Sequence, residues 1–209
     1  MLSIWRFAVL LAATVLAACS SKDGTDEYAL YRQAGARCGP ALDEPVRVGF
    51  ERWAAWSNSK EKGAFRDAGM TFEHLYKSGC RDGLVVYRYG NLMRLKDRCE
   101  QAIAMIGSSL PDLEAQYGDR ELNYAHAGIA QCSTSLGRHD DAIRHYRMAL
   151  EHDANDVNSM LNLATRYYWK KDCGNATAMI ARAEANRNLN SYGRKVADDL
   201  RTKLKPICS

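Results

Sequence analysis

The sequence has 209 residues, of which 26% are charged, and its formal net charge at pH 7 is +4. Residues 1–18 contain a single charged side chain, Arg6, so the remaining chain carries +3. A charge this small and this evenly spread does not favour nucleic-acid binding. The residues from Cys19 onwards have the length of one domain.

An uncharged, apolar run follows Arg6 and extends from Phe7 to Ala18. It is too short to cross a hydrocarbon core of about 30 Å as a helix, which needs about 20 residues. A basic residue followed by such a run is typical of a signal peptide. Residues 1–18 are therefore predicted to be removed.

The sequence Leu16-Ala17-Ala18-Cys19 resembles a bacterial lipobox, in which the cysteine thiol is acylated and the chain is cleaved before it. The resemblance implies lipidation of Cys19 and a place in the bacterial cell envelope, and Ser20 favours the outer membrane, facing the periplasm. Two or three acyl chains give a stable anchor. Residues 19–27 are polar after the cysteine and predict a flexible tether. The alternative is an ordinary secretory signal with a cysteine nearby.

Two stretches of the remaining chain share a helical pattern. Ala142, Tyr146 and Ala149 have the i, i+4, i+7 spacing of one helix face, and the same pattern recurs 34 residues later. The recurring residues are Ala176, Ile180 and Ala183. Each set follows another helical stretch, 122–136 or 157–170. A helix pair with this period is typical of the tetratricopeptide repeat (TPR). Residues 136–156 closely resemble the second half of the TPR consensus.

This resemblance to TPR proteins implies an all-α, right-handed helical solenoid of about four helix pairs plus a C-terminal capping helix. We expect a capping segment at 28–48 and a solenoid at 49–209. Its repeats are expected at 49–82, 83–122, 123–156 and 157–190, with the cap at 191–205. The second repeat contains an extra segment near 117–122, and Pro111 is expected to break its outer helix. An unrelated helical bundle is the alternative.

Six cysteines remain if Cys19 carries lipid, and an even number in an oxidising compartment favours disulfides. Pairing them in sequence order gives separations close to one repeat. These pairs are Cys38–Cys80, Cys99–Cys132 and Cys173–Cys208. Cys132–Cys173 competes with them, and six reduced thiols are a further alternative. The absence of a C-x-x-C pair argues against redox exchange and a structural zinc site.

The sequence contains no G-x-S-x-G, H-E-x-x-H or glycine-rich phosphate-binding motif. His145 and His152 are seven residues apart on one predicted helix, whereas metal-binding pairs on a helix are usually three or four apart. They are interpreted as surface or groove side chains. We therefore expect a protein that is not an enzyme and that holds no cofactor or metal.

In TPR proteins the first helix of each pair lines a concave peptide-binding groove. The register implies groove positions for aromatic, amide and arginine side chains, which are suited to peptide binding. These are Trp53, Tyr87, Arg88, Asn91, Arg94, Tyr124, Gln131, Asn162, Thr165 and Tyr168. Tyr87 stands where the family's two-carboxylate clamp has a lysine, so that clamp is not expected. Packing between repeats is the alternative role for the aromatic residues.

These expectations combine into a membrane-anchored periplasmic protein that serves as a protein-protein interaction scaffold or assembly factor. Its partner is expected to be a protein or peptide of the cell envelope, with no nucleic acid involved. The alternatives are a regulatory subunit that docks onto a cell-wall or secretion enzyme, and a purely structural spacer.

Overall fold

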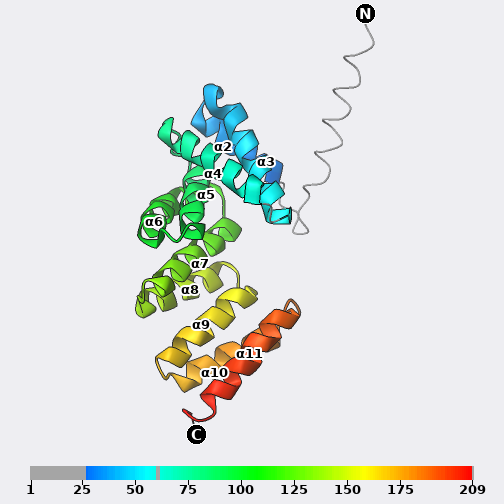
Figure 1. The fold of residues 1–209 in the computed structure, drawn as a ribbon, viewed down its shortest axis with the longest axis vertical. Coiled ribbons are helices and arrows are strands. Elements are labelled where there is room, and N and C mark those ends of the chain that lie inside the picture. The colour runs from blue at the N-terminus through cyan, green and yellow to red at the C-terminus, as the bar shows by residue number, and fades with distance from the viewer. Residues whose placement is uncertain (1–26, 60–61, 209) are drawn as a thin grey trace, which may run out of the picture. The chain divides into compact units, whose positions relative to one another are not determined.

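The computed structural model describes residues 27–59 and 62–208, which divide into two compact units. Unit 1 ends at Cys80, and unit 2 begins at Arg81. The described part is built from helices, shown in Figure 1. The predicted signal peptide and the acylation site at Cys19 lie outside the described residues.

Unit 1 is a helix pair preceded by a shorter helix. Its elements are α2 (Glu27–Cys38), the 3-10 turn η2 (Pro40–Leu42), α3 (Asp43–Ser59) and α4 (Lys62–Lys77). Phe50 of α3 is buried at its centre, stacked on Tyr31 with 4.3 Å between ring centroids and edge-on to Phe72 at 5.2 Å. The first helix of this pair begins at Asp43, before the expected repeat start at residue 49.

Unit 2 contains three helix pairs and a final helix, stacked in chain order (Figure 1). The pairs are α5 (Gly83–Leu95) with α6 (Cys99–Gln116), α7 (Asp119–Ser135) with α8 (His139–His152), and α9 (Val157–Trp169) with α10 (Cys173–Glu184). Below, α5, α7 and α9 are called inner helices, and α6, α8 and α10 outer helices. The outer helix of each pair packs on the next inner helix, and α11 (Ser191–Leu204) packs on α9 and α10.

Small residues allow the helices of unit 2 to pack closely. Ala142, Ala149, Ala176 and Ala183 are completely buried, and Tyr146 fills the space between its two alanine neighbours on α8. Larger side chains here would overpack the interface and typically cost about 1–3 kcal/mol. The face predicted from the 34-residue pattern is therefore the buried face of the outer helices.

Residues 119–122 of the extra segment are helical, and Pro111 does not break α6. Helix α6 runs through this proline to Gln116, because Leu113 beyond it is completely buried and this burial offsets the hydrogen bond that proline cannot donate. The turn that follows needs Gly118, whose φ of 80° disfavours other residues. Helix α7 then begins at Asp119, so the expected inner-helix start at residue 123 is too late.

Two of the predicted cysteine pairs, Cys38–Cys80 and Cys173–Cys208, are disulfides in the structure. The third predicted pair is wrong: Cys99 and Cys132 are free, buried thiols in the structure. Burial, together with a hydrogen bond between these two side chains, raises the pKa of Cys132 to about 12. Since the thiolate is the form that reacts, this environment disfavours oxidation of the pair.

Candidate functional site

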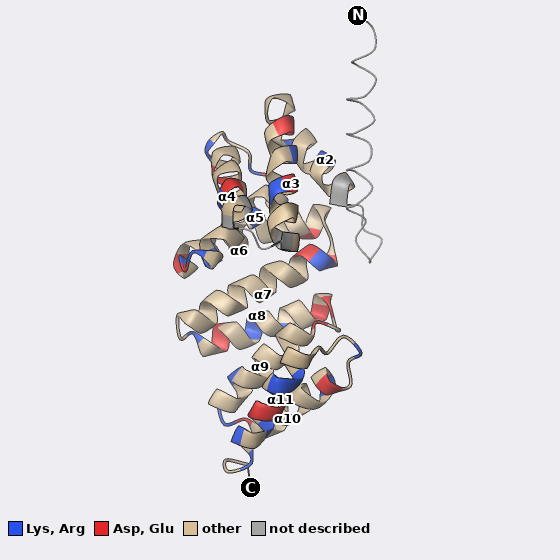
Figure 2. Cartoon of the chain, turned by 45° about the vertical axis from the view of Figure 1, so that its right-hand side comes forward, with Lys and Arg blue, Asp and Glu red and all other residues tan. Residues whose placement is uncertain are grey.

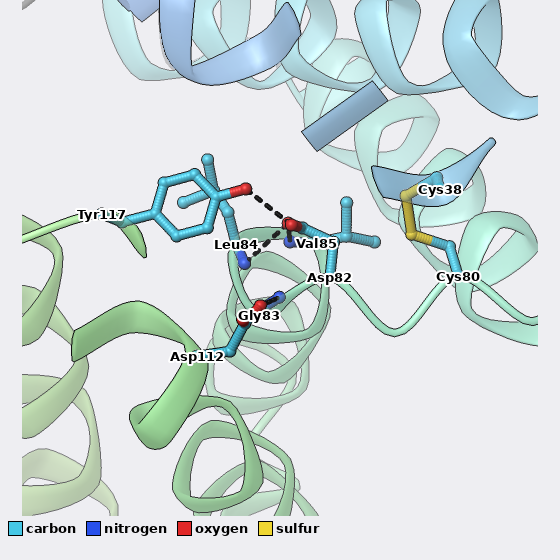
Figure 3. The surroundings of a disulfide bond; sticks show 8 residues. All are labelled: Cys38, Cys80, Asp82, Gly83, Leu84, Val85, Asp112 and Tyr117. Atoms are coloured by element: carbon cyan, nitrogen blue, oxygen red, sulfur yellow. Dashed lines mark hydrogen bonds between the residues drawn. A yellow bond between two sulfur atoms is a disulfide. The ribbon is translucent and has the colours of Figure 1, made fainter. Parts of the chain in front are cut away.

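The surface formed by the inner helices of unit 2 starts at a hydrogen-bonded cap on α5. Asp82 accepts hydrogen bonds from the backbone N–H groups of Leu84 at 3.0 Å and Val85 at 3.3 Å, as a helix N-cap does. Its other carboxylate oxygen accepts a hydrogen bond of 2.6 Å from the Tyr117 hydroxyl, and Asp112 accepts one from the Gly83 N–H (Figure 3). The segment after α6 is thereby attached to the start of α5.

A similar cap joins the next two inner helices. Asp156 accepts from the N–H groups of Asn158 and Ser159 at the start of α9. The Asn123 side chain of α7 donates to Asp156 at 3.2 Å and to the Ala149 carbonyl at 2.9 Å. Each of these N-cap aspartates is therefore bonded to an aromatic or amide side chain from outside its own helix. The Asp156 contacts fix α7 relative to α9, and the Asp82 contacts fix α5 relative to the end of α6.

The inner surface of α5 is occupied by the protein's own side chains. Arg88 is buried and pairs with Glu121 of α7, with Nη2 3.4 Å from Oε2. Arg120 approaches the other oxygen of Glu121, also at 3.4 Å. Glu121 lies in the extra segment of the second repeat, so the early start of α7 supplies the carboxylate that neutralises Arg88.

For three residues of α5, the prediction that they line an open groove is therefore wrong. Tyr87, Arg88 and Asn91 are buried, so they do not offer a docking surface. Burial raises the pKa of Tyr87 to about 12. Arg94 is half-buried and donates to the Asn91 side-chain oxygen at 2.7 Å and to Gln131 of α7 at 2.6 Å. Gln131 is also half-buried.

The inner surface of α7 and α9 is more accessible than that of α5. Tyr124 on α7 is 50% exposed, Asn162 on α9 is exposed, and Thr165 and Tyr168 are half-buried. Among the described residues, Asn162 and Thr165 donate only to carbonyl groups of their own helix, at 2.9 and 2.8 Å. Helix α7 carries no charged residue after Glu121, as Figure 2 shows. These four residues, Tyr124, Asn162, Thr165 and Tyr168, are called the α7–α9 surface.

Trp53, the remaining predicted groove residue, belongs to unit 1. It is half-buried on α3 and lies against two aromatic rings, Trp56 at 5.0 Å and Phe72 at 6.3 Å between centroids. In this environment Trp53 packs within its own helix pair, which is the alternative that the sequence left open for the aromatic residues.

Histidines of α7 and α8 form a cluster that sequence reasoning missed. The Nδ1 atoms of His126 and His145 are 3.1 Å apart, and the His152 ring stacks on His126 with 5.6 Å between centroids. His152 also contacts Asp119 at 2.9 Å. Burial, reinforced by the two other histidines, lowers the pKa of His126 to about 4. His145 and His152, which the sequence places at the surface or in the groove, are both half-buried and each contacts His126.

Unit 2 also has a hollow of about 470 Å³ on its outer helices, which the sequence did not indicate. It lies between α8 and the α9–α10 turn, and Arg144, Arg147, Met148 and Tyr167 are among its lining residues. Arg147 donates to the Tyr167 hydroxyl at 2.8 Å. Its lining contains as many acidic as basic side chains, so it favours neither sign of charge.

Within residues 27–59 and 62–208, no three His, Cys, Asp or Glu side chains are arranged to hold a metal ion. In the same ranges, no helix is long and apolar enough to cross a membrane.

No protein-family model matches the sequence, and neither does any curated protein. Solved structures do resemble the fold. A chain of the APC/C hetero-tetramer Cut9–Hcn1 has a TM-score of 0.65 and 18% identity over 75% of this chain, which spans 29% of that chain. YrrB, a TPR protein with an unusual peptide-binding site, has a TM-score of 0.56 and 16% identity, and the match covers 84% of this chain and 86% of YrrB.

A TPR protein from Parabacteroides merdae ATCC 43184 gives a TM-score of 0.52 and 14% identity, covering 77% of this chain and 64% of that one. The structural likeness shows a common fold, and at such low identities it does not show a common function. The helix pairs, the buried alanines and the likeness to solved structures all indicate the same architecture. The chain has the all-α fold of tetratricopeptide-repeat proteins.

Proposed function

We propose that this protein is a lipid-anchored scaffold or assembly factor of the bacterial cell envelope, and that it binds a protein partner on the α7–α9 surface. The observation that carries the proposal is the exposure of Tyr124 and Asn162, with Tyr168 half-buried, on two helices that the Asp156 cap joins. Aromatic and amide side chains on a rigid surface are suited to binding peptides, because little side-chain freedom is lost.

The envelope location is supported by the lipobox-like sequence that ends in Cys19 and by the two disulfides, which are typical of oxidising compartments. Cys19→Ala is expected to give an uncleaved precursor or a protein without lipid. Fractionation of bacterial cells and mass measurement of the amino-terminal peptide test this. Processing and fractionation identical to the parent would contradict the anchor.

The docking surface is tested by placing a photocrosslinking amino acid at residue 124 or 162 in intact cells. Both positions are expected to capture the same protein, which mass spectrometry identifies. Tyr192 on α11 provides the control position, because its side chain is 73% exposed and lies outside the α7–α9 surface. Capture at Tyr192 but at neither inner position would rule the surface out.

Affinity measurements with the captured partner give the size of the effect. Tyr124→Ala and Tyr168→Ala are each expected to weaken binding about thirtyfold, which corresponds to about 2 kcal/mol. Arg144→Ala and Arg182→Ala on the outer helices serve as controls and should bind like the parent. The reverse pattern would move the site to the outer helices, where the hollow beside α8 lies.

Two other functions give different results in these experiments. A regulatory subunit would capture an enzyme of the cell wall or of secretion, and the α7–α9 variants would change the activity of that enzyme. A structural spacer would lose no function when this surface is altered.

A further inference from the structure

The turns of unit 2 form two edges with different charge. The turns that lead from an inner to an outer helix lie on the same side for the α7–α8 and α9–α10 pairs (Figure 1). The three such turns contain five basic and two acidic residues: Lys96, Arg98, Arg138, Lys170 and Lys171, with Asp97 and Asp172. The opposite turns contain one basic and two acidic residues: Arg187, with Asp153 and Asp156.

The positive edge also exposes large apolar side chains at its C-terminal end. Trp169, the last residue of α9, is 63% exposed and has Tyr168 as a ring neighbour at 5.5 Å. Ile207 is 40% exposed, and the adjacent Cys208 is bonded to Cys173 at the start of α10. The disulfide therefore holds Ile207 near the turn that follows Trp169.

Two lysines beside these side chains have no acidic partner. Lys170 pairs with Asp140 and Lys203 pairs with Asp199. In the described part of the chain, Lys171 and Lys205 lie in no ion pair. We call Trp169, Lys171, Lys205 and Ile207 the Trp169 edge. It combines exposed apolar groups with positive charge that no described acidic residue neutralises.

We propose that the Trp169 edge binds the surface of an anionic phospholipid membrane. Tryptophan is enriched at the headgroup level of bilayers, where its ring is apolar and its N–H meets water. Each lysine near an anionic surface strengthens binding about fivefold. The acidic Asp153 and Asp156 on the opposite edge disfavour the reverse orientation.

A protein partner fits this edge less well than a membrane. Stable protein interfaces bury about 800 Å² on each side around a packed centre. This edge offers two separate apolar side chains, one at the end of α9 and one in the turn after α11. A lipid surface does not require a preformed pocket, and its negative charge complements the unpaired lysines. The proposal does not depend on the acyl anchor, so it stands or falls separately from the proposed function.

The experiment uses the chain from residue 20 to residue 209 without lipid, which keeps every described residue. Binding is measured by sedimentation with phosphatidylcholine vesicles that contain phosphatidylglycerol, and with phosphatidylcholine alone. We expect binding to the anionic vesicles that weakens as salt is added. In a W53F/W56F background, which leaves Trp169 as the only tryptophan, its emission should shift to shorter wavelength on binding.

Variants assign the effect to the edge. Lys171→Gln and Lys205→Gln should each weaken binding about fivefold and together about twenty-five-fold. Trp169→Ala should weaken it further, and the lysine variants test the edge even if this replacement disturbs packing. Arg187→Gln and Tyr192→Ala, which change charge and exposed aromatic surface elsewhere, are the matched controls.

Absence of binding to anionic vesicles would overturn the proposal. Equal loss in the control variants, or no loss in the edge variants, would also overturn it. If Trp169→Ala abolished capture of a protein partner in cells and left vesicle binding intact, the edge would be a protein-docking site instead.

Discussion

The inner surfaces of α5 and α9 hold polar residues at the same register position, yet one is closed and the other open. Arg88 of α5 is buried against Glu121, whereas Asn162 of α9 is exposed and bonds only to its own helix. The difference comes from the helix that follows in the stack. Helix α7 brings Glu121 in its first turn, but α11, which packs on α9, has no acidic residue in its first turn.

This comparison shows that a groove position in the repeat register does not by itself make a residue available to a partner. A buried arginine needs a carboxylate, because an uncompensated charge in a low-dielectric interior is costly. The protein satisfies that need internally at Arg88. Accessible binding groups therefore remain where the following helix offers no internal partner.

The largest change in the free energy of unfolding is expected when the ion pair on the inner surface of α5 is removed. Glu121→Ala leaves the buried Arg88 without its carboxylate and should lower the free energy of unfolding of unit 2 by about 3–5 kcal/mol. Urea titration followed by circular dichroism measures this. Replacing both partners, in Arg88→Met with Glu121→Leu, should recover much of the loss. A loss below about 1 kcal/mol in the single variant would show that the pair does not hold α5 and α7 together.

The α7–α8 pair should lose stability in acid more than the α9–α10 pair, which contains no histidine. His126 has a pKa lowered from 6.5 to about 4 in the folded protein, so the unfolded chain binds more protons between these values. The free energy of unfolding should therefore fall as pH decreases from about 6.5 to 4, by on the order of 1–3 kcal/mol.

Hydrogen exchange at several pH values measures this effect by region. Amides of α7 and α8 should lose protection on acidification more than those of α9 and α10. His126→Phe keeps an aromatic ring but cannot bind a proton, so it should flatten the pH dependence. An unchanged pH profile in that variant would remove the histidine cluster as its cause.

The fold was predictable because it depends on local pattern. Ala142 and Ala176 repeat at one period, and small residues are required wherever two helices approach closely. The closed surface was not predictable in this way, because Arg88 and Glu121 are 33 residues apart. The same holds for Arg94 and Gln131, which are 37 apart.

One signal for the start of α7 was present in the sequence. Asp119 and Glu121 follow Gly118, and acidic residues in a first turn are favoured by the helix dipole. The histidine cluster had no comparable signal, because His126 and His145 lie on different helices, α7 and α8. Likewise, the regular spacing of the cysteines does not reveal that Cys99 and Cys132 are free.

A smaller effect is expected at the cap that joins the segment after α6 to α5. Tyr117→Phe removes the hydroxyl that donates to Asp82 and keeps the ring. The loss of one hydrogen bond should lower the free energy of unfolding by about 1 kcal/mol. Asp82 retains its two backbone donors, so the N-cap itself should persist. A stability equal to that of the parent would mean that water replaces the hydroxyl at no cost.

The smallest effect on stability is expected on the open surface. Asn162→Ala removes an exposed amide that bonds only to the Asn158 carbonyl, so the free energy of unfolding should change by less than about 0.5 kcal/mol. Arg88→Ala at the matching position of α5 should be clearly destabilising, because it leaves the Glu121 carboxylate buried beside Arg120 alone.

Urea titrations of these two variants side by side measure the difference between closed and open surfaces directly. If Asn162→Ala were as destabilising as Arg88→Ala, Asn162 would be part of the protein's own packing. That result would contradict the proposal that the α7–α9 surface binds a partner. A stable Asn162→Ala variant that binds the captured protein more weakly would separate docking from folding, because the side chain would then contribute to the complex and not to the free protein.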